Sequence, residues 1–267
     1  MNKKVRGMEK RSVVLAIANQ KGGVAKTTTV IMTAYLLSQK YKVLAVDLDG
    51  QSDLTEAMTE QASVRFDGET ILEAMLARNA RPYIKKITDT LDLIPSNDLL
   101  ANINEHLYGD LKKGGRSLVL KETLATVWND YDWVILDAAP SLDLLMTNCL
   151  SAADYVVIPF KPSPFCAHAL ERFMETIETV QEMTNPELKV IGILLSMIDL
   201  RRSDVRSYIN YLNDLYEDLV FKTIIKQAAS RERFTIGSFF TNPETLEAAE
   251  PFAQYLEELL ERIGGTT

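Results

Sequence analysis

The sequence predicts a doubly wound α/β fold, with a mostly parallel β-sheet and helices on both of its faces. Short runs of β-branched and other apolar residues alternate along the chain with longer stretches whose apolar residues recur at helical spacing. The chain has 267 residues and only two cysteines. A chain of this length buries an extensive core without disulfides or a structural metal.

Six short apolar runs are expected to form the strands of this sheet. Their composition is typical of parallel strands that are covered on both faces. They are VVLAIA (13–18), VLAVDLD (43–49), LDLIP (91–95), WVILDA (133–138), YVVIPF (155–160) and VIGILLSMI (190–198).

Helical periodicity marks the segments between and after these runs, at 26–39, 116–131, 165–183 and 243–265. Gly264 and Gly265 mark the end of the last helix, which is expected to close over an edge of the sheet. The alternation predicts repeated βα units with right-handed crossovers. The longest piece without a pattern, about 50–70, is expected to be a functional loop.

The same patterns predict the organisation of the chain. Residues 1–11 form a short basic arm that we expect to be flexible, and residues 12–265 form one domain. The first apolar run is too short for a signal peptide or a membrane span. Cys149 and Cys166 lack zinc-site spacing, which fits a protein of the reducing cytoplasm.

The stretch NQKGGVAKTTT (19–29) directly follows the first strand and opens a helix near Lys26. Gly22 and Gly23 allow successive backbone N–H groups to face inward, and the helix N-terminus adds partial positive charge. We therefore expect phosphate to bind here, with Lys26 reaching the β- and γ-phosphates and the Thr27 hydroxyl binding Mg²⁺. The strict pattern G-x-x-x-x-G-K-[ST] is not met, because Gln20 and Ala25 stand at glycine positions.

KGGVAKTT resembles the deviant Walker A box KGGxGKTT of the ParA/MinD class of partition and positioning ATPases, which are P-loop NTPases. The resemblance implies ATP and Mg²⁺ as ligands. It also implies that Lys21 reaches across an ATP-bound homodimer to the phosphates of the partner copy, where a cation stabilises the transition state. The implied nucleotide-binding residues of the loop are Lys21, Gly22, Gly23, Val24, Ala25, Lys26, Thr27 and Thr28.

VDLDGQSDLT (46–55) resembles the family's switch, VDxDPQGNxT. The resemblance implies that Asp47 supports the Mg²⁺ shell and that Asp49 orients or activates the attacking water. Their i, i+2 spacing is expected to put both carboxylates on one face of the strand. Gly50 replaces the family's proline, and Ser52 with the following aspartate replaces its Gly-Asn.

YDWVILDAAPSLDLLMTN (131–148) resembles the family's YDxIxxDxPPSLGxLTxN, a strand that ends in the Walker B aspartate. That residue is Asp137, which the resemblance implies binds Mg²⁺ through water, beside Thr27 and Asp47. Ligand groups of doubly wound sheets lie at the carboxyl ends of strands. Asp143 stands where the family usually has glycine.

The resemblance covers residues 12–265. Within the family, the chain is most similar to the small Soj-like partition ATPases. Lys226 and Gln227 occupy the family's adenine-side loop. Residues 201–233 carry seven basic and five acidic residues. The resemblance places contacts to DNA within this stretch, at Arg201, Arg202, Arg231 and Arg233.

The formal charge of −8 excludes a protein that coats DNA constitutively, but it leaves binding by an ATP-bound dimer open. The resemblance implies an ATPase that dimerises with ATP and binds double-stranded DNA nonspecifically. A ParB-like centromere-binding partner would stimulate its slow hydrolysis. Its function would be to partition a plasmid or chromosome, or to position another cargo, in the cytoplasm on the nucleoid.

Two other functions stay open. The first is a MinD-like positioning ATPase on membranes, which the acidic C-terminal segment disfavours because anionic lipid attracts basic helices. The second is a regulator or scaffold that binds ATP but hydrolyses it weakly, which Ala25 and the altered switch at 50–53 suggest. Relatives with a bridging iron–sulfur cluster are disfavoured by the cysteine pattern.

Overall fold

The computed structural model describes residues 11–110, 115–162, 166–199, 201, 203–227, 235, 237 and 243–265. In this part of the chain eight strands form one sheet, in the order β3-β4-β2-β5-β1-β6-β7-β8. Neighbouring strands are parallel except for the pair β3–β4. The strands are β1 Val13–Ile17, β2 Val43–Leu48, β3 Lys85–Lys86, β4 Leu91–Ile94, β5 Trp133–Ala138, β6 Tyr155–Phe160, β7 Lys189–Ile198 and β8 Val220–Lys226.

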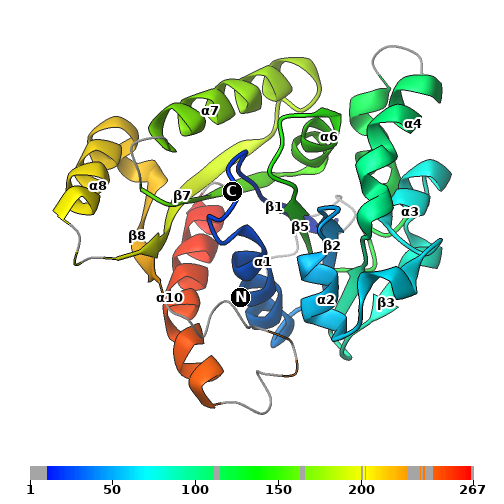
Figure 1. Ribbon diagram of the computed structural model, residues 1–267, viewed down its shortest axis with the longest axis horizontal. Helices are drawn as coiled ribbons and strands as arrows, with labels where there is room; N and C mark the ends of the chain where they lie inside the picture. Colours follow the sequence, from blue (N-terminus) through cyan, green and yellow to red (C-terminus); the bar gives the residue numbers. More distant parts are fainter. Residues whose placement is uncertain are drawn as a thin grey trace.

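Helices cover both faces of the sheet (Figure 1). The α-helices are α1 Lys26–Ser38, α2 Asp53–Thr59, α3 Ile71–Ala77, α4 Ile103–Asp110, α5 Val119–Ala125, α6 Leu144–Ala152, α7 Cys166–Met183, α8 Ser203–Tyr216 and α10 Pro243–Gly265. Short 3₁₀ turns are η1 Ser63–Phe66, η2 Arg81–Tyr83, η3 Asp98–Asn102, η4 Arg116–Leu118 and η5 Glu217–Leu219. The predicted fold class is confirmed.

Two hydrophobic clusters form the core, one on each face of the sheet. In β1, Val14 and Ala16 belong to the cluster under α3 to α8, whereas Leu15 and Ile17 belong to the cluster under α1, α2 and α10. All four side chains are fully buried. This alternation explains why the strand reads as a continuous apolar run in the sequence.

The C-terminal helix α10 packs against α1, β7 and β8, beside the sheet edge that β8 forms. Phe252, Tyr255 and Leu259 are fully buried in this packing, and the ring of Tyr255 meets Phe221 of β8 edge to face. The expected closure of this helix over the sheet edge is present. Within the described residues, no helix combines the length and the apolar composition that a membrane crossing requires.

Three segments differ from the sequence-based expectations. The piece 50–70 is not a plain loop, because it contains α2 and η1. The expected helix at 116–131 is shorter, since α5 ends at Ala125 and turns follow it. Strands β3 and β8 were not expected from the apolar runs, and β8 pairs irregularly with β7. Most of the expected N-terminal arm lies outside the described residues.

Candidate functional site

The glycine loop lies between the carboxyl end of β1 and the first turn of α1. Three side-chain hydrogen bonds fix it to its surroundings. Asn19 Nδ2 donates to a backbone carbonyl of β6 at 2.8 Å, and Gln20 Nε2 donates to a carbonyl of α7. From β7, Ser196 Oγ donates to the carbonyl of Val24 at 2.7 Å. Strands β6 and β7 and helix α7 therefore help to fix the position of this loop.

The backbone of this loop is tightly curled. Gly23 has a φ of 70°, and Ala25, the N-cap residue of α1, has a φ of 62° and a ψ of 36°. Gly23 and Ala25 both lie in the left-handed region of backbone conformation. This conformation costs a residue with a Cβ about 1–2 kcal/mol in stability. Glycine at position 25, as in the family's box, would avoid this strain. Ala25 therefore adopts the loop conformation at a cost in stability.

Lys26 points into the interior of the site. Its side chain is buried, and Nζ donates a hydrogen bond to the carbonyl of Lys21 at 3.3 Å. Burial lowers the pKa of Lys26, while the nearby carboxylates of Asp137 and Asp49 oppose this shift. Lys21 itself is half-buried, and its N–H donates to Asn19 Oδ1 at 2.9 Å. The loop thus places an ammonium group between its backbone and two carboxylates.

Asp47 and Asp137 are paired residues on the adjacent strands β2 and β5. Both are buried. Asp47 has hydrogen-bond donors on both oxygens: Oδ1 accepts from the N–H of Asp49 at 3.1 Å, and Oδ2 accepts from the N–H and hydroxyl of Thr55 at 2.9 and 2.6 Å. Asp47 therefore holds the start of the switch and the first turn of α2 together.

The surroundings of Asp137 are different. Neither of its buried oxygens meets hydrogen-bond geometry with a described group, although the Thr27 hydroxyl lies close enough to favour the charged form. Burial raises the pKa of Asp137 above its ordinary value, and the charge of Asp47 raises it further. A buried carboxylate that lacks hydrogen-bond donors destabilises the folded protein unless a cation or a water molecule supplies the missing interactions. This position is suited to a hydrated cation.

Burial also raises the pKa of Asp47, to about 7, against the hydrogen bonds from Thr55 and Asp49. Two carboxylates on adjacent strands cannot both ionise in a buried site without a compensating cation. Lys26 supplies part of that compensation. Among the described residues, no group of three or more His, Cys, Asp or Glu side chains is arranged to hold a metal by itself. A divalent cation here would need hydroxyl, water or ligand oxygens as well.

Asp49 lies at the mouth of this site, half-buried, after the end of β2. Its Oδ1 accepts a hydrogen bond from the N–H of Gln51 at 3.0 Å, and its carbonyl accepts from the N–H of Ser52. Ser52 is a buried N-cap with a φ of 62°, so this departure from the family's glycine also lies in the left-handed region. Asp49 lines a cavity of about 320 Å³ that Asp143 also lines.

The role of Asp143 becomes clear from the structure. Its carboxylate caps α6 by accepting hydrogen bonds from the N–H groups of Leu145 and Met146, at 3.0 and 3.2 Å. It also accepts from Asn104 Nδ2 at 3.0 Å, which ties α4 to the same turn. An aspartate is a favoured N-cap residue. The replacement of the family's glycine therefore strengthens the start of α6.

The carboxyl ends of β7 and β8 form a second part of the site. Arg201, Lys226 and Gln227 line one cavity of about 420 Å³ with Asp199. The Arg201 guanidinium makes two hydrogen bonds of 2.8 Å to the Asp199 carboxylate. Lys226 and Gln227, which we expected to contact the adenine, thus lie in one cavity with Arg201, which we expected to contact DNA. The other expected DNA-binding residues, Arg202, Arg231 and Arg233, lie outside the described residues.

Sequence reasoning located the loop and the carboxylates but missed the residues that position them. Thr55 links Asp47 to the N–H of Ser96, which donates to Thr55 Oγ1 at 2.8 Å. Ser196 and Asn19 anchor the glycine loop. Thr55 and Asn19 stand within the quoted motifs, so their closeness in sequence to the proposed site residues could have indicated their positioning role. Ser96 and Ser196 follow or end strands far along the chain, and no local pattern marks them.

A family model described as an AAA domain matches residues 12–190. The sporulation initiation inhibitor protein Soj of Bacillus subtilis is 36% identical over 216 residues, which cover 79% of this chain and 83% of Soj. The chromosome-partitioning ATPase Soj of Thermus thermophilus is 31% identical, over 93% of this chain and 96% of that protein.

Among solved structures, cobyrinic acid a,c-diamide synthase from Mycobacterium smegmatis, with a bound ATP analogue and magnesium, has a TM-score of 0.81 and 31% identity. The similarity covers 96% of this chain and 97% of that one. A plasmid partition protein from Borrelia burgdorferi has a TM-score of 0.75 and 26% identity, over 95% of this chain and 100% of that one.

Proposed function

Because the chain belongs to the AAA-domain family and to the Soj and ParA partition ATPases, we propose that it is an Mg²⁺-dependent ATPase that dimerises with ATP. The observation that carries this proposal is the glycine loop at the start of α1, with the buried Lys26 bonded to the loop backbone and influenced by the charges of Asp137 and Asp49. A phosphate chain in the loop would meet inward backbone N–H groups, an ammonium and a helix N-terminus.

ATP and Mg²⁺ fit the residues of this site. The loop from Lys21 to Thr28 would bind the phosphates, and Lys226 and Gln227 would contact the adenine side. Thr27 would bind Mg²⁺, Asp47 would support the Mg²⁺ shell, and Asp137 would bind Mg²⁺ through water. The incompletely bonded carboxylate of Asp137 supports this assignment. When bound, Mg²⁺ neutralises charge on the phosphate oxygens.

Asp49 and Lys21 would perform the catalytic work. Asp49 would orient the attacking water, and the hydrogen bond from its N–H to Asp47 supports a fixed position for it. Lys21 would reach the phosphates of a second copy of the chain in the ATP-bound dimer. A cation supplied in this way stabilises charge that develops in the transition state, and is worth about 10³- to 10⁵-fold in rate where an arginine supplies it.

Phosphate release and sedimentation with Mg²⁺-ATP test this proposal together. We expect the protein to become dimeric with ATP, and Lys21→Ala to lower the rate of hydrolysis by at least tenfold. Asp49→Ala should lower hydrolysis and leave ATP binding intact. A matched control is Lys40→Ala, because Lys40 is exposed beyond the end of α1. Wild-type hydrolysis equal to that of Lys21→Ala would contradict the enzymatic role and favour a regulator that only binds ATP.

The left-handed residues Ala25 and Ser52 are the observation that favours this second candidate, a weakly hydrolysing regulator or scaffold. Both stand where the family's motifs have glycine; Ala25 directly precedes Lys26, and the N–H of Ser52 donates to the carbonyl of Asp49. Strain at these positions would be consistent with a slow basal rate. A ParB-like partner would then be needed to raise the rate, so hydrolysis should be measured with and without DNA and the partner.

We assign nonspecific DNA binding to the ATP-bound dimer, through Arg201, Arg202, Arg231 and Arg233. The logarithm of the affinity for arbitrary duplex should fall with log salt by about 0.9 for each phosphate neutralised. Arg201→Glu combined with Arg231→Glu should abolish DNA binding, and ATP affinity is measured in parallel because Arg201 lines the same cavity as Lys226 and Gln227. Unchanged DNA binding by this double variant would disprove the assignment. The proposed location is the cytoplasm, on the nucleoid, with partition of a plasmid, chromosome or other cargo as the task.

A further inference from the structure

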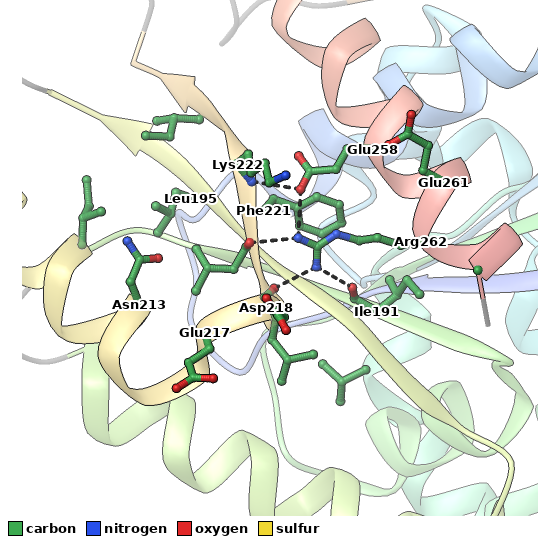
Figure 2. A pocket seen from close by; sticks show the side chains of 16 residues that line it. Ile191, Leu195, Asn213, Glu217, Asp218, Phe221, Lys222, Glu258, Glu261 and Arg262 are labelled. Atoms are coloured by element: carbon green, nitrogen blue, oxygen red, sulfur yellow. Dashed lines mark hydrogen bonds and ion pairs between the residues drawn. The ribbon is translucent and has the colours of Figure 1, made fainter.

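A groove lies at the amino ends of β7 and β8, at the opposite end of these strands from the glycine loop. It has a volume of about 740 Å³ and runs between α8 with η5 on one side and α10 on the other (Figure 2). Within the described residues it is larger than either cavity at the nucleotide site. We refer to it as the β8 groove.

The strands that line this groove pair irregularly. Ile193 pairs with Val220, and the next paired residues are Leu195 and Ile224, so β8 contributes two more residues than β7 between these pairs. Where the ladder is interrupted, α10 supplies the hydrogen bonds. Glu258 accepts from the N–H groups of Lys222 and Thr223, at 3.0 and 3.2 Å. The backbone N–H groups of β8 at the interruption are therefore bonded to helix α10.

Arg262 completes this connection. Its guanidinium donates to the carbonyls of Ile191 and Val220, at 3.0 and 2.9 Å, and to Glu258 Oε1 at 2.8 Å. It also stacks over the ring of Phe221, 4.2 Å from the ring centroid. These bonds, drawn in Figure 2, fix the inner wall of the groove. The β8 groove is consequently preformed, which reduces the entropic cost of binding.

The floor of the β8 groove is apolar and incompletely covered. Val190, Ile209, Leu219 and Ile224 line it and are each only half-buried. A partner that covers half-buried aliphatic side chains in one hollow stabilises the complex, because apolar surface is removed from water. The floor thus favours an occupant with apolar side chains.

The rim of the β8 groove is acidic. Glu217 and Asp218 lie on the side of η5, and Glu261 lies across from them on α10 (Figure 2). All three are exposed, whereas Glu258 is paired with Arg262. Lys222 is the other basic residue of the lining. Anionic lipid and nucleic acid would be repelled by this rim, and long basic side chains of a protein could reach it.

We propose that the β8 groove binds a short segment of a partner protein in which basic side chains alternate with apolar ones. The apolar side chains would cover the floor, and the basic side chains would pair with Glu217, Asp218 and Glu261. Because the groove is remote from the glycine loop, this binding does not require nucleotide. The inference is independent of ATP hydrolysis, and its failure would leave the proposed ATPase function untouched.

Selection from a phage-displayed library of random 12-residue peptides, on the full chain without nucleotide, tests the inference. We expect the enriched peptides to combine Lys or Arg with Leu, Ile or Phe. Their synthetic forms should slow amide hydrogen exchange in residues 217–226. Replacing their apolar residues with serine should weaken binding at least tenfold, as measured by fluorescence anisotropy.

A charge-reversal pair of variants separates the groove from general acidity. Glu217→Lys combined with Glu261→Lys should weaken binding of the selected peptides at least tenfold. The control, Asp214→Lys combined with Glu257→Lys, makes the same change of charge at exposed residues that do not line the groove, and should change binding less than twofold. Equal losses in the two variants, or enrichment of no peptide of this kind, would overturn the inference. So would concentration-dependent self-association of the wild type that the groove variant abolishes, because the occupant would then be a second copy.

Discussion

Asp47 and Asp137 lie side by side on neighbouring strands, yet only one of them is fully hydrogen-bonded by the protein. Asp47 holds the backbone around Asp49 and Thr55, and Asp137 keeps its oxygens available. The same residue type thus has two tasks within one site. One carboxylate shapes the switch, and the other is suited to a cation.

Thr55 is the residue on which this shaping depends. Its hydroxyl donates to Asp47 and accepts from the N–H of Ser96, and all three residues are fully buried. Thr55→Val should lower the free energy of unfolding by about 1–3 kcal/mol, because two buried polar groups lose a partner. Urea denaturation measures this change. Thr55→Ser keeps the hydroxyl and should cost less, and equal losses for the two variants would show that the methyl group contributes as much as the hydroxyl.

The buried carboxylates predict an unusual pH dependence for the protein without nucleotide. The pKa values of Asp47 and Asp137 are raised in the folded state above the unfolded value of about 3.9, so the native state retains protons that the unfolded chain has released. The free energy of unfolding should therefore fall as pH rises from about 4 to about 7. Asp137→Asn should make this slope shallower, by removing one of the two groups.

Denaturant unfolding at pH 5, 6 and 7, without Mg²⁺ or ATP, measures the slope. Asp214→Asn serves as the control, because Asp214 is exposed on α8 and should leave the slope unchanged. Parallel slopes for Asp137→Asn and the wild type would mean that Asp137 does not hold its proton in the folded protein.

At the start of α1, the loop requires a left-handed backbone conformation at a position that is occupied by alanine. Ala25 has left-handed angles, and glycine adopts these without strain. Ala25→Gly should raise the free energy of unfolding by about 0.5–1 kcal/mol, since the relief of strain exceeds the added entropy of the unfolded chain. Thermal denaturation without nucleotide checks this. Ala57→Gly within α2 is the matched control and should lower stability by about 1 kcal/mol.

The strands and longest helices were predictable because their apolar spacing reflects burial directly. Six runs became β1, β2, β4, β5, β6 and β7, nearly within their predicted bounds. Strand β8 escaped prediction because α10 supplies part of its hydrogen bonding through Glu258, which no pattern within 220–226 reveals. The switch was recognisable as a motif, but α2 inside it was not, since its start depends on the left-handed Ser52 and on Asp47.

Charge is distributed unevenly over the protein as a whole. The formal charge of −8 includes the acidic rim of the β8 groove, at the amino ends of its strands, while Arg201 and Lys226 lie at the carboxyl ends. A DNA surface and a partner surface at these two ends would not compete for one site. The acidic body would also limit the proposed DNA binding to states in which basic residues of two copies are combined.

Asp199 sets the strength of the proposed DNA contact at Arg201, because it makes two hydrogen bonds to that guanidinium. Asp199→Asn should tighten binding of the ATP-bound dimer to arbitrary duplex several-fold at about 0.1 M salt, since each copy loses one charge that repels phosphate. Fluorescence anisotropy with labelled duplex measures it. Asp214→Asn removes a distant charge and should have a smaller effect; equal effects would indicate that only net charge matters.

The central strand of the sheet has a consequence for how the chain acquires its structure. β1 is the first strand along the chain, but Val13 pairs with Trp133 and Leu15 pairs with Tyr155. β1 and β2 are not neighbours, because β5 lies between them. During synthesis on the ribosome, the glycine loop therefore has no finished sheet beneath it until residues 133–160 have emerged. Such long-range pairing slows folding and leaves apolar strands exposed to chaperones in the meantime.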